Sequence, residues 1–262
     1  MLIETNENVD GYVKSELHKH VAVIEFFHPK GNSLTSALLK KLTQEIHYAA
    51  NNQDANIIVI RSAGTGAFCG GASLDELSDI KTEEKAVEFF SGIAHVINAM
   101  RKCPKLIIAR VHGKCVGSGV GLIAATDYAI AQEGADIKLT ELSLGFGPYV
   151  IAPALQRKLG FSAFSQLAID SLLWRSSDWA RRKGLYAELH PNLESMEESL
   201  ERLSHSLTNT SRDATAELKN TFWKDAQNWD ELLHERAHIS AKLLLKEETQ
   251  NEISKFKNKT VS

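Results

Sequence analysis

The 262-residue sequence contains only three cysteines, Cys69, Cys103 and Cys115. Their number is odd and no CxxC pair occurs, so we expect neither a disulfide framework nor a structural zinc ribbon. The sequence places no base beside Cys69 or Cys115 that would make either thiol a nucleophile. We therefore interpret these cysteines as small core-filling side chains of a protein in a reducing compartment.

The chain also lacks an excess of one charge and a long apolar run. It has 30 Lys and Arg against 33 Asp and Glu, a net charge of −3, which argues against a nucleic-acid partner. No apolar run approaches the ~20 residues that span a bilayer, and the N-terminus does not resemble a signal peptide. We expect a cytoplasmic protein that binds neither membranes nor nucleic acid.

Two phosphate-binding motifs are missing, although the segment GKCVGSGVGLIAATD at residues 113–127 is rich in glycine. Gly117 and Gly119 would begin GxGxxG, but residue 122 is leucine, and no P-loop GxxxxGK[ST] occurs. Two explanations for the glycines stay open. They form a tight turn with close backbone packing, or they leave backbone N–H groups bare for a ligand.

The sequence does contain alternating strand and helix patterns. The period-2 pattern over residues 12–27 predicts a hairpin with its turn near residues 18–20. Helical spacing predicts a helix over residues 36–52 with Ser36 as its N-cap, and another over 82–101. This order predicts an α/β fold with parallel strands in a core at residues 1–193. Short apolar runs predict its buried strands at residues 56–62, 105–111 and 127–132.

The last quarter of the chain has a different texture. From residue 194 onward strand patterns disappear, and charge-rich helical patterns with spaced leucine and isoleucine continue to residue 257. We predict a helical region at residues 194–262. Its apolar stripes need a surface to cover them, so we expect packing against the core or against a second subunit.

A second glycine-rich segment, GTGAFCGGASLDEL at residues 64–77, also follows a predicted buried strand and also leads into a helical pattern. Ligands of open α/β sheets bind outside the carboxyl ends of the strands, so both turns can present N–H groups to one site. Two converging amides form an oxyanion hole, which suits a carbonyl oxygen that gains negative charge during a reaction.

Both glycine-rich segments, together with LTELSLGFGP at residues 139–148, closely resemble the crotonase superfamily, the enoyl-CoA hydratases and isomerases. The segments HPKGNSLTSALLKKL and NEISKFKNK extend the resemblance over nearly the whole chain. The resemblance implies a crotonase-like spiral of ββα units, with C-terminal helices that build a homotrimer or a dimer of trimers. It also implies an acyl-CoA substrate, so coenzyme A belongs to the substrate and no separate cofactor is expected.

The resemblance assigns the two oxyanion amides to Ala72 and Ser118. Ser118 stands where the family usually has glycine, and its hydroxyl can serve as an additional donor. The positions that the resemblance assigns to substrate binding are Lys30, Gly70, Ala72, Leu74, Gly117, Ser118 and Gly121.

Several basic residues are weaker candidates for a functional role. Lys30 and Lys259 match positions at which the family approaches the coenzyme A nucleotide, although an isolated lysine in a loop is more often simply solvated. Arg157 and Lys158 lie early in a predicted helix, and we interpret them as ordinary surface charges.

The resemblance also indicates which acidic residues would take part in the reaction. Hydratases of the family carry two glutamates on opposite sides of a water molecule; here the first position is Gly121 and the second is Glu141. One carboxylate suffices to move a proton between the α and γ carbons through an enolate, as in the Δ3,Δ2-isomerases of the family. The alternative for Glu141 is an exposed loop carboxylate. As a base it needs a pKa raised by an apolar pocket. The lining we predict is Phe146, Tyr149, Val150 and Ile151.

Other functions stay open beside isomerisation. The same site can support enoyl-CoA hydration, or lyase or decarboxylase chemistry, and a protein that kept the fold but lost one acid would bind acyl-CoA without catalysis. HERAH at residues 234–238 satisfies the zinc-protease spacing HExxH. Its helix is full of charge and no GxxH ligand follows, so we interpret this match as chance and expect no metal.

Overall fold

The computed structural model describes residues 11–260, with side chains through residue 257. It begins with the predicted hairpin, in which β1 (Tyr12–His18) pairs antiparallel with β2 (Val21–Phe27). The two turn residues, Lys19 and His20, have φ values of 46° and 66°. Positive φ at both positions is typical of a two-residue hairpin turn whose twist matches that of its strands.

A parallel stack of strands continues from β2. Its members are β3 (Ile57–Ser62), β4 (Ile107–Val111), β6 (Tyr128–Gln132) and β8 (Glu188–His190). The three apolar runs predicted as buried strands are β3, β4 and β6, which confirms those predictions. The sequence did not predict β8 or the short pair β5 (Cys115–Val116) and β7 (Ile137–Lys138), because two or three residues are too few to show a period.

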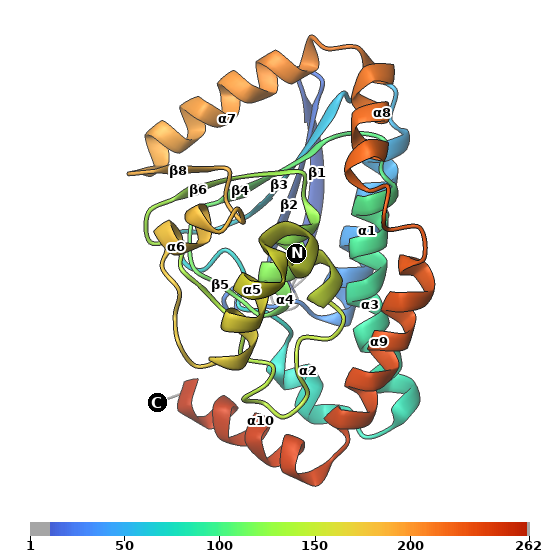
Figure 1. The fold of residues 1–262 in the computed structure, drawn as a ribbon, viewed down its shortest axis with the longest axis vertical. Helices are drawn as coiled ribbons and strands as arrows, with labels where there is room; N and C mark the ends of the chain where they lie inside the picture. Colours follow the sequence, from blue (N-terminus) through green and yellow to red (C-terminus); the bar gives the residue numbers. More distant parts are fainter. Residues whose placement is uncertain (1–10, 261–262) are drawn as a thin grey trace, which may run out of the picture.

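Helices cover both faces of this sheet (Figure 1). Their bounds are α1 (Ser36–Asn51), α2 (Leu74–Asp79), α3 (Glu83–Lys102), α4 (Ser118–Ala125), α5 (Ala152–Ile169), α6 (Ser177–Arg182), α7 (Leu193–Thr208), α8 (Arg212–Phe222), α9 (Trp229–Leu244) and α10 (Glu247–Thr260). Alternate residues of β3 serve opposite faces: Ile58 and Ile60 pack in the main core with α1 and α3, whereas Ile57 and Val59 pack with Met196 of α7.

The first helix is capped one residue earlier than predicted. The side-chain oxygen of Thr35 accepts a hydrogen bond from the amide of Leu38 at 3.2 Å, so Thr35 is the N-cap of α1. Ser36 is the first helical residue instead, and its own amide donates to the carboxylate of Glu76 at 2.8 Å. The prediction of Ser36 as the cap was therefore wrong. Both residue types can cap a helix, and the bond to Glu76 draws the amide of Ser36 toward another element.

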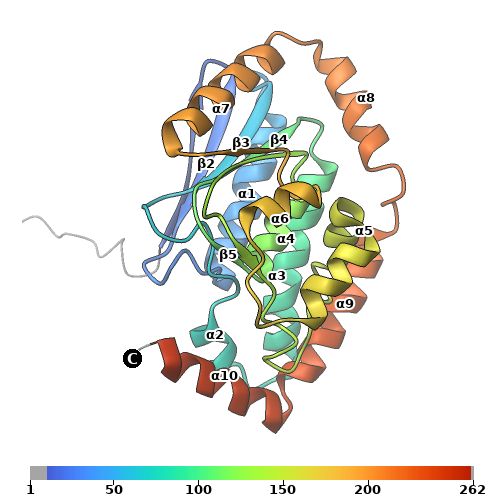
Figure 2. The ribbon, with the colours of Figure 1, turned by 60° about the vertical axis from the view of Figure 1, so that its left-hand side comes forward.

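The C-terminal helices pack on the core of the same chain. The helical pattern expected from residue 194 begins with α7, and α9 lies along α3 while α10 lies against α2 (Figures 1 and 2). The apolar stripe of α9, which includes Leu233 and Leu244, is buried there. The division into parts at residues 1–193 and 194–262 stays a prediction. None of the described helices has the length and apolar character needed to cross a membrane.

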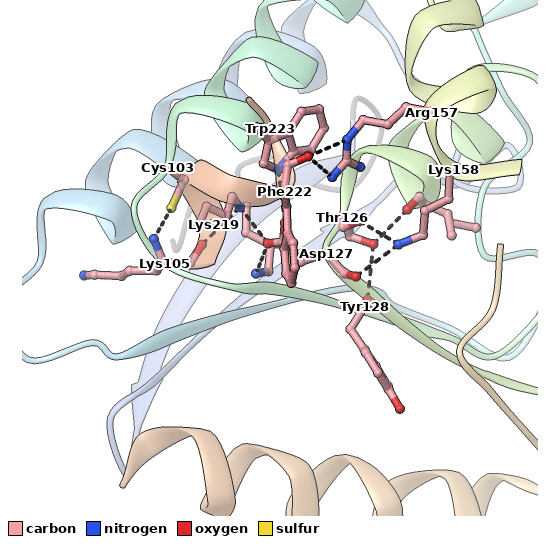
Figure 3. A network of polar contacts seen from close by, with 12 residues as sticks. Cys103, Lys105, Thr126, Asp127, Tyr128, Arg157, Lys158, Lys219, Phe222 and Trp223 are labelled. Carbon is pink, nitrogen blue, oxygen red and sulfur yellow. Dashed lines mark hydrogen bonds and ion pairs between the residues drawn. The ribbon is translucent and has the colours of Figure 1, made fainter. Parts of the chain in front are cut away.

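A buried ion pair fastens α8 to the sheet (Figure 3). The ammonium of Lys219 lies 2.6 Å from the carboxylate of Asp127, and the two side chains are 1% and 3% exposed. The carboxylate also accepts hydrogen bonds from the amide of Ile107 at 2.8 Å and the indole of Trp223 at 3.2 Å. Because these donors satisfy the buried carboxylate, its desolvation is compensated.

Arg157 and Lys158 belong to the same network, so their interpretation as surface charges was wrong. Lys158 Nζ donates to the carbonyls of Thr126 and Asp127 at 3.1 and 3.0 Å, just past the end of α4. The Arg157 guanidinium donates to the carbonyl of Phe222, the last residue of α8, at 2.8 Å. Cations at helix C-termini compensate the partial negative charge of the unpaired carbonyls. Burial lowers the pKa of Lys158 to about 8.

We expect Lys219→Ala to lower the free energy of unfolding by about 3–5 kcal/mol, because it leaves the Asp127 carboxylate buried without its counter-ion. Arg182→Ala, which breaks the exposed pair with Asp178, is the control and costs about 1 kcal/mol or less. Urea unfolding of both variants measures the difference. Equal losses would contradict a structural role for the buried pair.

Candidate active site

The two glycine-rich turns follow neighbouring strands, β3 and β4, and their backbones touch. A Cβ atom at Gly71 would lie 3.0 Å from the carbonyl oxygen of Val116, and the Val116 amide donates to the carbonyl of Cys69 at 2.9 Å. The sequence prediction that both turns lie above adjacent strand ends is confirmed. The close approach also explains why residue 71 has no side chain.

The first of the two amides belongs to Ala72. The backbone around it is fixed by hydrogen bonds from Gly70 to the carbonyl of Gly31 at 2.8 Å and from Ser73 to the carbonyl of Leu34 at 2.9 Å. These bonds engage the peptide groups on either side of Ala72. Within residues 11–260, the Ala72 N–H itself donates to no protein group, so it is available to a ligand.

The second amide belongs to Ser118, the first residue of α4. Gly117 precedes it with φ 55° and ψ −123°, a conformation that favours glycine, and a Cβ atom there would lie 2.7 Å from Oε1 of Glu141. In the described part of the chain the Ser118 N–H also donates to no protein group. It lies in the first turn of a helix, where the helix dipole favours a negative charge.

Glu141 supplies the carboxyl group of the site. The residue is only 8% exposed, and its Oε2 atom has no hydrogen-bond partner among the described residues. Burial raises the pKa of Glu141 to about 7, while the amides of Glu141 and Thr140 act in the opposite direction. The predicted rise of the pKa is confirmed, and the alternative of an exposed loop carboxylate is wrong.

One small cavity, of about 20 Å³, is lined by Ala72, Ser118 and Glu141 together. The four residues predicted as its apolar lining, Phe146, Tyr149, Val150 and Ile151, also line it. Three further lining residues were not predicted: Phe90 and Ile93 of α3 and Ser240 of α9. Their positions show only ordinary helical spacing, and nothing in a single sequence indicates which helices close a cavity.

Gly121 lies on α4 directly against Ile151. A Cβ atom at residue 121 would lie 2.4 Å from Cγ2 of Ile151, which is 3% exposed. The space that a side chain at residue 121 would need is therefore filled by a rigid β-branched residue. The space that the side chain of a second acid at residue 121 would occupy is therefore apolar and filled.

Three positions assigned to substrate binding do not line the cavity: Lys30, Gly70 and Leu74. The side chain of Lys30 is 69% exposed and forms an ion pair with Asp75, whose carboxylate also lies 2.8 Å from Lys257. The ammonium groups of Lys257 and Lys30 lower the pKa of Asp75 to about 2. The side chain of Lys259 lies outside the described residues.

The structure also shows the surroundings of the HExxH match and of the two cysteines in the glycine-rich turns. Nε2 of His234 and Nε2 of His238 lie 3.2 Å apart on α9, and the described residues contain no cluster of three or more His, Cys, Asp or Glu side chains around them. Cys69 and Cys115 are fully buried against Gly119, and burial raises the pKa of both thiols. The interpretation of these cysteines as core-filling residues is confirmed.

A family model described as "Enoyl-CoA hydratase/isomerase" matches residues 16–261. Enoyl-CoA hydratase domain-containing protein 3, mitochondrial, of Rattus norvegicus is 29% identical over 196 residues, 74% of this chain and 63% of that relative. Methylglutaconyl-CoA hydratase, mitochondrial, of the same organism is 35% identical over 141 residues, 50% of this chain and 44% of that relative. The chain thus spans less than two thirds of the length of these relatives.

Solved structures share the fold. An enoyl-CoA hydratase from Bacillus halodurans superposes with a TM-score of 0.87 at 20% identity, over 93% of this chain and 99% of that one. An enoyl-CoA hydratase from Mycobacterium avium gives 0.82 at 23% identity, over 94% of this chain and 96% of that one. The expected crotonase-like α/β fold is therefore confirmed.

The raised pKa of Glu141 predicts a pH-dependent cost in stability. The carboxyl group titrates at about 7 in the folded protein and at 4.5 ordinarily, so its ionised form destabilises the fold. Glu141→Gln should raise the free energy of unfolding well above pH 7 by on the order of 3 kcal/mol. The gain should vanish as the pH falls from about 7 through 4.5, where both states bind the proton. Urea unfolding across this range, with exposed Glu198→Gln as control, measures it; a gain independent of pH would refute the assignment.

Proposed function

The chain belongs to the enoyl-CoA hydratase/isomerase family, and from this premise we propose that it converts a 3-enoyl-CoA thioester to its 2-enoyl isomer. One observation carries the proposal: a single buried carboxyl group, Glu141, shares its cavity with the unengaged amides of Ala72 and Ser118. Deprotonation beside a carbonyl needs this combination of a base and an oxyanion hole.

The residues divide the reaction into two proton transfers. The Glu141 carboxylate removes the α-proton of the thioester, and the electron pair of that C–H bond delocalises onto the thioester oxygen. The amides of Ala72 and Ser118 stabilise the resulting enolate by hydrogen bonds. Glu141 then returns the proton to the γ-carbon, which leaves the double bond in conjugation with the carbonyl. A pKa near 7 lets one group act first as base and then as acid.

The lining of the cavity supports chemistry with one acid. Among the described residues that line it, Glu141 is the only one with a carboxyl group. Ile151 fills the space beside Gly121, so α4 offers no second acid. Proton transfer between two carbons of one substrate requires a single carboxylate and no activated water.

Hydration of a 2-enoyl-CoA is the second candidate, and the Ser118 side chain favours it. Its hydroxyl is buried without a partner in the described chain, and so is Oε2 of Glu141. A cavity of about 20 Å³ admits one water molecule, which these two groups could orient together. One relative named above is a methylglutaconyl-CoA hydratase, and the other is named for an enoyl-CoA hydratase domain. Lyase or decarboxylase chemistry and binding without catalysis are the remaining alternatives.

We further propose that the protein forms a trimer or a dimer of trimers. The second half of α5 and the turn after it expose a row of large apolar side chains: Phe161, Ile169, Leu172, Leu173 and Trp174. Such a patch is unusual on a monomer and marks a protein interface.

The buried, unpaired thiols of the three cysteines support a reducing location such as the cytoplasm.

We expect the protein to convert a 3-enoyl-CoA with a rise in the absorbance of the conjugated thioester, and Glu141→Gln to lower turnover by at least about two orders of magnitude. The rate should rise with pH through about 7, as Glu141 ionises. A panel of 3-enoyl, 2-enoyl and branched dicarboxylic CoA esters provides the measurement.

The panel also separates the alternatives. Full activity of Glu141→Gln would exclude this residue as the base. Efficient hydration of crotonyl-CoA, lost on Ser118→Gly, would establish the second candidate instead. Binding of CoA esters without turnover of any member would identify a non-catalytic protein.

Leu172→Asp should dissociate the assembly, because it places a charge in the exposed apolar row. Sedimentation equilibrium of the wild type should give three or six times the chain mass, and the variant should sediment as a smaller species. Lys183→Asp, at an exposed position outside the row, is the matched control. A wild type that sediments as a monomer would contradict the proposal.

A further inference from the structure

An open groove of about 760 Å³ lies between α7 and the β1–β2 hairpin, and we call it the α7 groove. Its apolar lining includes Val21, Val23 and Val59 of the sheet and Leu200 of α7. The groove shares no lining residue with the reaction cavity or with the exposed apolar row at the end of α5. Both ribbon views show α7 at the top of the molecule and α5 below it (Figures 1 and 2). The groove is therefore a separate surface.

The sheet face at this groove is only partly covered. Ala22 and Ile24 of β2 are buried in the main core, whereas Val21 and Val23 point to the other face and are half-buried. Leu200, which packs on the same face, is half-buried as well. Covering these apolar side chains removes apolar surface from water, which favours association with a partner.

Hydrogen bonds hold the two sides of the groove together. The backbone amide of Asn56 donates to the carbonyl of His20 in the hairpin turn at 2.8 Å. The side-chain amide of Asn56 donates to the carbonyl of Thr208, the last residue of α7, at 2.7 Å. One residue thus ties the hairpin turn to the end of α7. A surface held in this way loses little conformational freedom when a partner binds.

Most of the Asp, Glu, Lys and Arg side chains at the groove have partners in the same chain. The paired groups are Arg61 with Glu25, Glu197 with Arg110, and Arg202 with Glu188. Lys19 of the hairpin turn and Glu201 of α7 are the exceptions. Both are exposed, and among the described residues neither side chain forms an ion pair or a hydrogen bond. The groove thus carries an unpaired cation on its hairpin side and an unpaired acid on its helix side.

This arrangement suits a second copy of the same chain. A two-fold axis places one surface against itself, so a cation on one side of the axis meets the acid from the other side, and does so twice. Lys19 and Glu201 then form two reciprocal ion pairs around the half-buried apolar side chains. A small ion, in contrast, is attracted by one of the two charges and repelled by the other.

We propose that the α7 groove is a two-fold contact between copies of this chain, with Lys19 of each copy beside Glu201 of the other. The inference rests on the proposed assembly, of which it selects the dimer of trimers, and it does not depend on the proposed reaction. A dimer of trimers needs a two-fold contact in addition to the contact that closes each trimer. The apolar row after α5 serves the trimer, and the α7 groove joins two trimers.

Charge reversal tests the pairing. The wild type should sediment at six times the chain mass. Lys19→Glu and Glu201→Lys each bring like charges together, so each single variant should weaken the contact between trimers at least about tenfold and sediment at three times the chain mass. The double variant, Lys19→Glu with Glu201→Lys, restores opposite charges in reversed order and should sediment as the wild type does.

Two exposed positions that do not line the groove provide matched controls. Lys40→Glu on α1 and Glu198→Lys on α7 make the same changes of charge, and both should leave the sedimentation unchanged. Urea unfolding of every variant shows whether it is folded. Loss of the six-chain assembly in the controls as well would attribute the effect to net charge and refute the contact.

Chemical cross-linking tests the contact without a substitution. A carbodiimide joins a carboxylate to an ammonium group that touches it. In protein refolded from a mixture of isotope-labelled and unlabelled chains, it should link Lys19 of one kind of chain to Glu201 of the other, and mass spectrometry of the peptides identifies the link. A link found only within chains of one kind would assign the pair to a single chain and refute the inference.

The sedimentation results also separate this inference from the other proposals. A wild type at three times the chain mass would overturn the two-fold contact and leave the trimer and the reaction intact. A double variant that stays dissociated would refute the pairing of Lys19 with Glu201. A wild type at twice the chain mass that Lys19→Glu splits would refute the trimer and leave the two-fold contact standing.

Discussion

The candidate active site depends on two backbone N–H groups that the fold leaves without a partner. Parallel strands β3 and β4 end at the same edge of the sheet, and the turns that follow them approach so closely that Gly71 has no room for a side chain. The carboxyl group of Glu141 occupies the space beside Gly117. The hydrogen bonds around Ala72 engage its neighbours, and Ser118 lies where a helix begins. An unpaired amide in such a place is costly, and a ligand oxygen is the partner that would satisfy it.

Burial of Glu141 beside these two amides favours its use as a base but destabilises the folded protein. The apolar side chains that close the cavity raise the pKa of the carboxyl group toward neutrality, which a base requires and which a fold must compensate elsewhere. Part of that compensation lies at the other end of α4. Ser118 begins this helix, and Asp127, two residues after its end, is held by Lys219 of α8. The ion pair therefore fixes the end of the helix whose first amide, that of Ser118, lies at the candidate site.

Family membership follows from the whole chain, whereas the kind of reaction depends on the local geometry of the cavity. The family match and the shared fold place the chain in the enoyl-CoA hydratase/isomerase family. Within this fold, Ile151 packs against Gly121, and Glu141 supplies the only carboxyl group among the described residues that line the cavity. A shared fold does not determine the reaction, which depends on packing within the site.

The sequence by itself determined the order of the longer strands and helices, the two glycine-rich turns and the acid that accompanies them, because period and backbone freedom are local properties. It also identified the apolar segment around residues 146–151. Only the tertiary structure decided which helices close the cavity, that Thr35 rather than Ser36 caps α1, and that Arg157 and Lys158 point to helix ends. Those outcomes depend on contacts between residues far apart in the chain, and neither α9 over the site nor Lys219 beside Asp127 leaves a local signal.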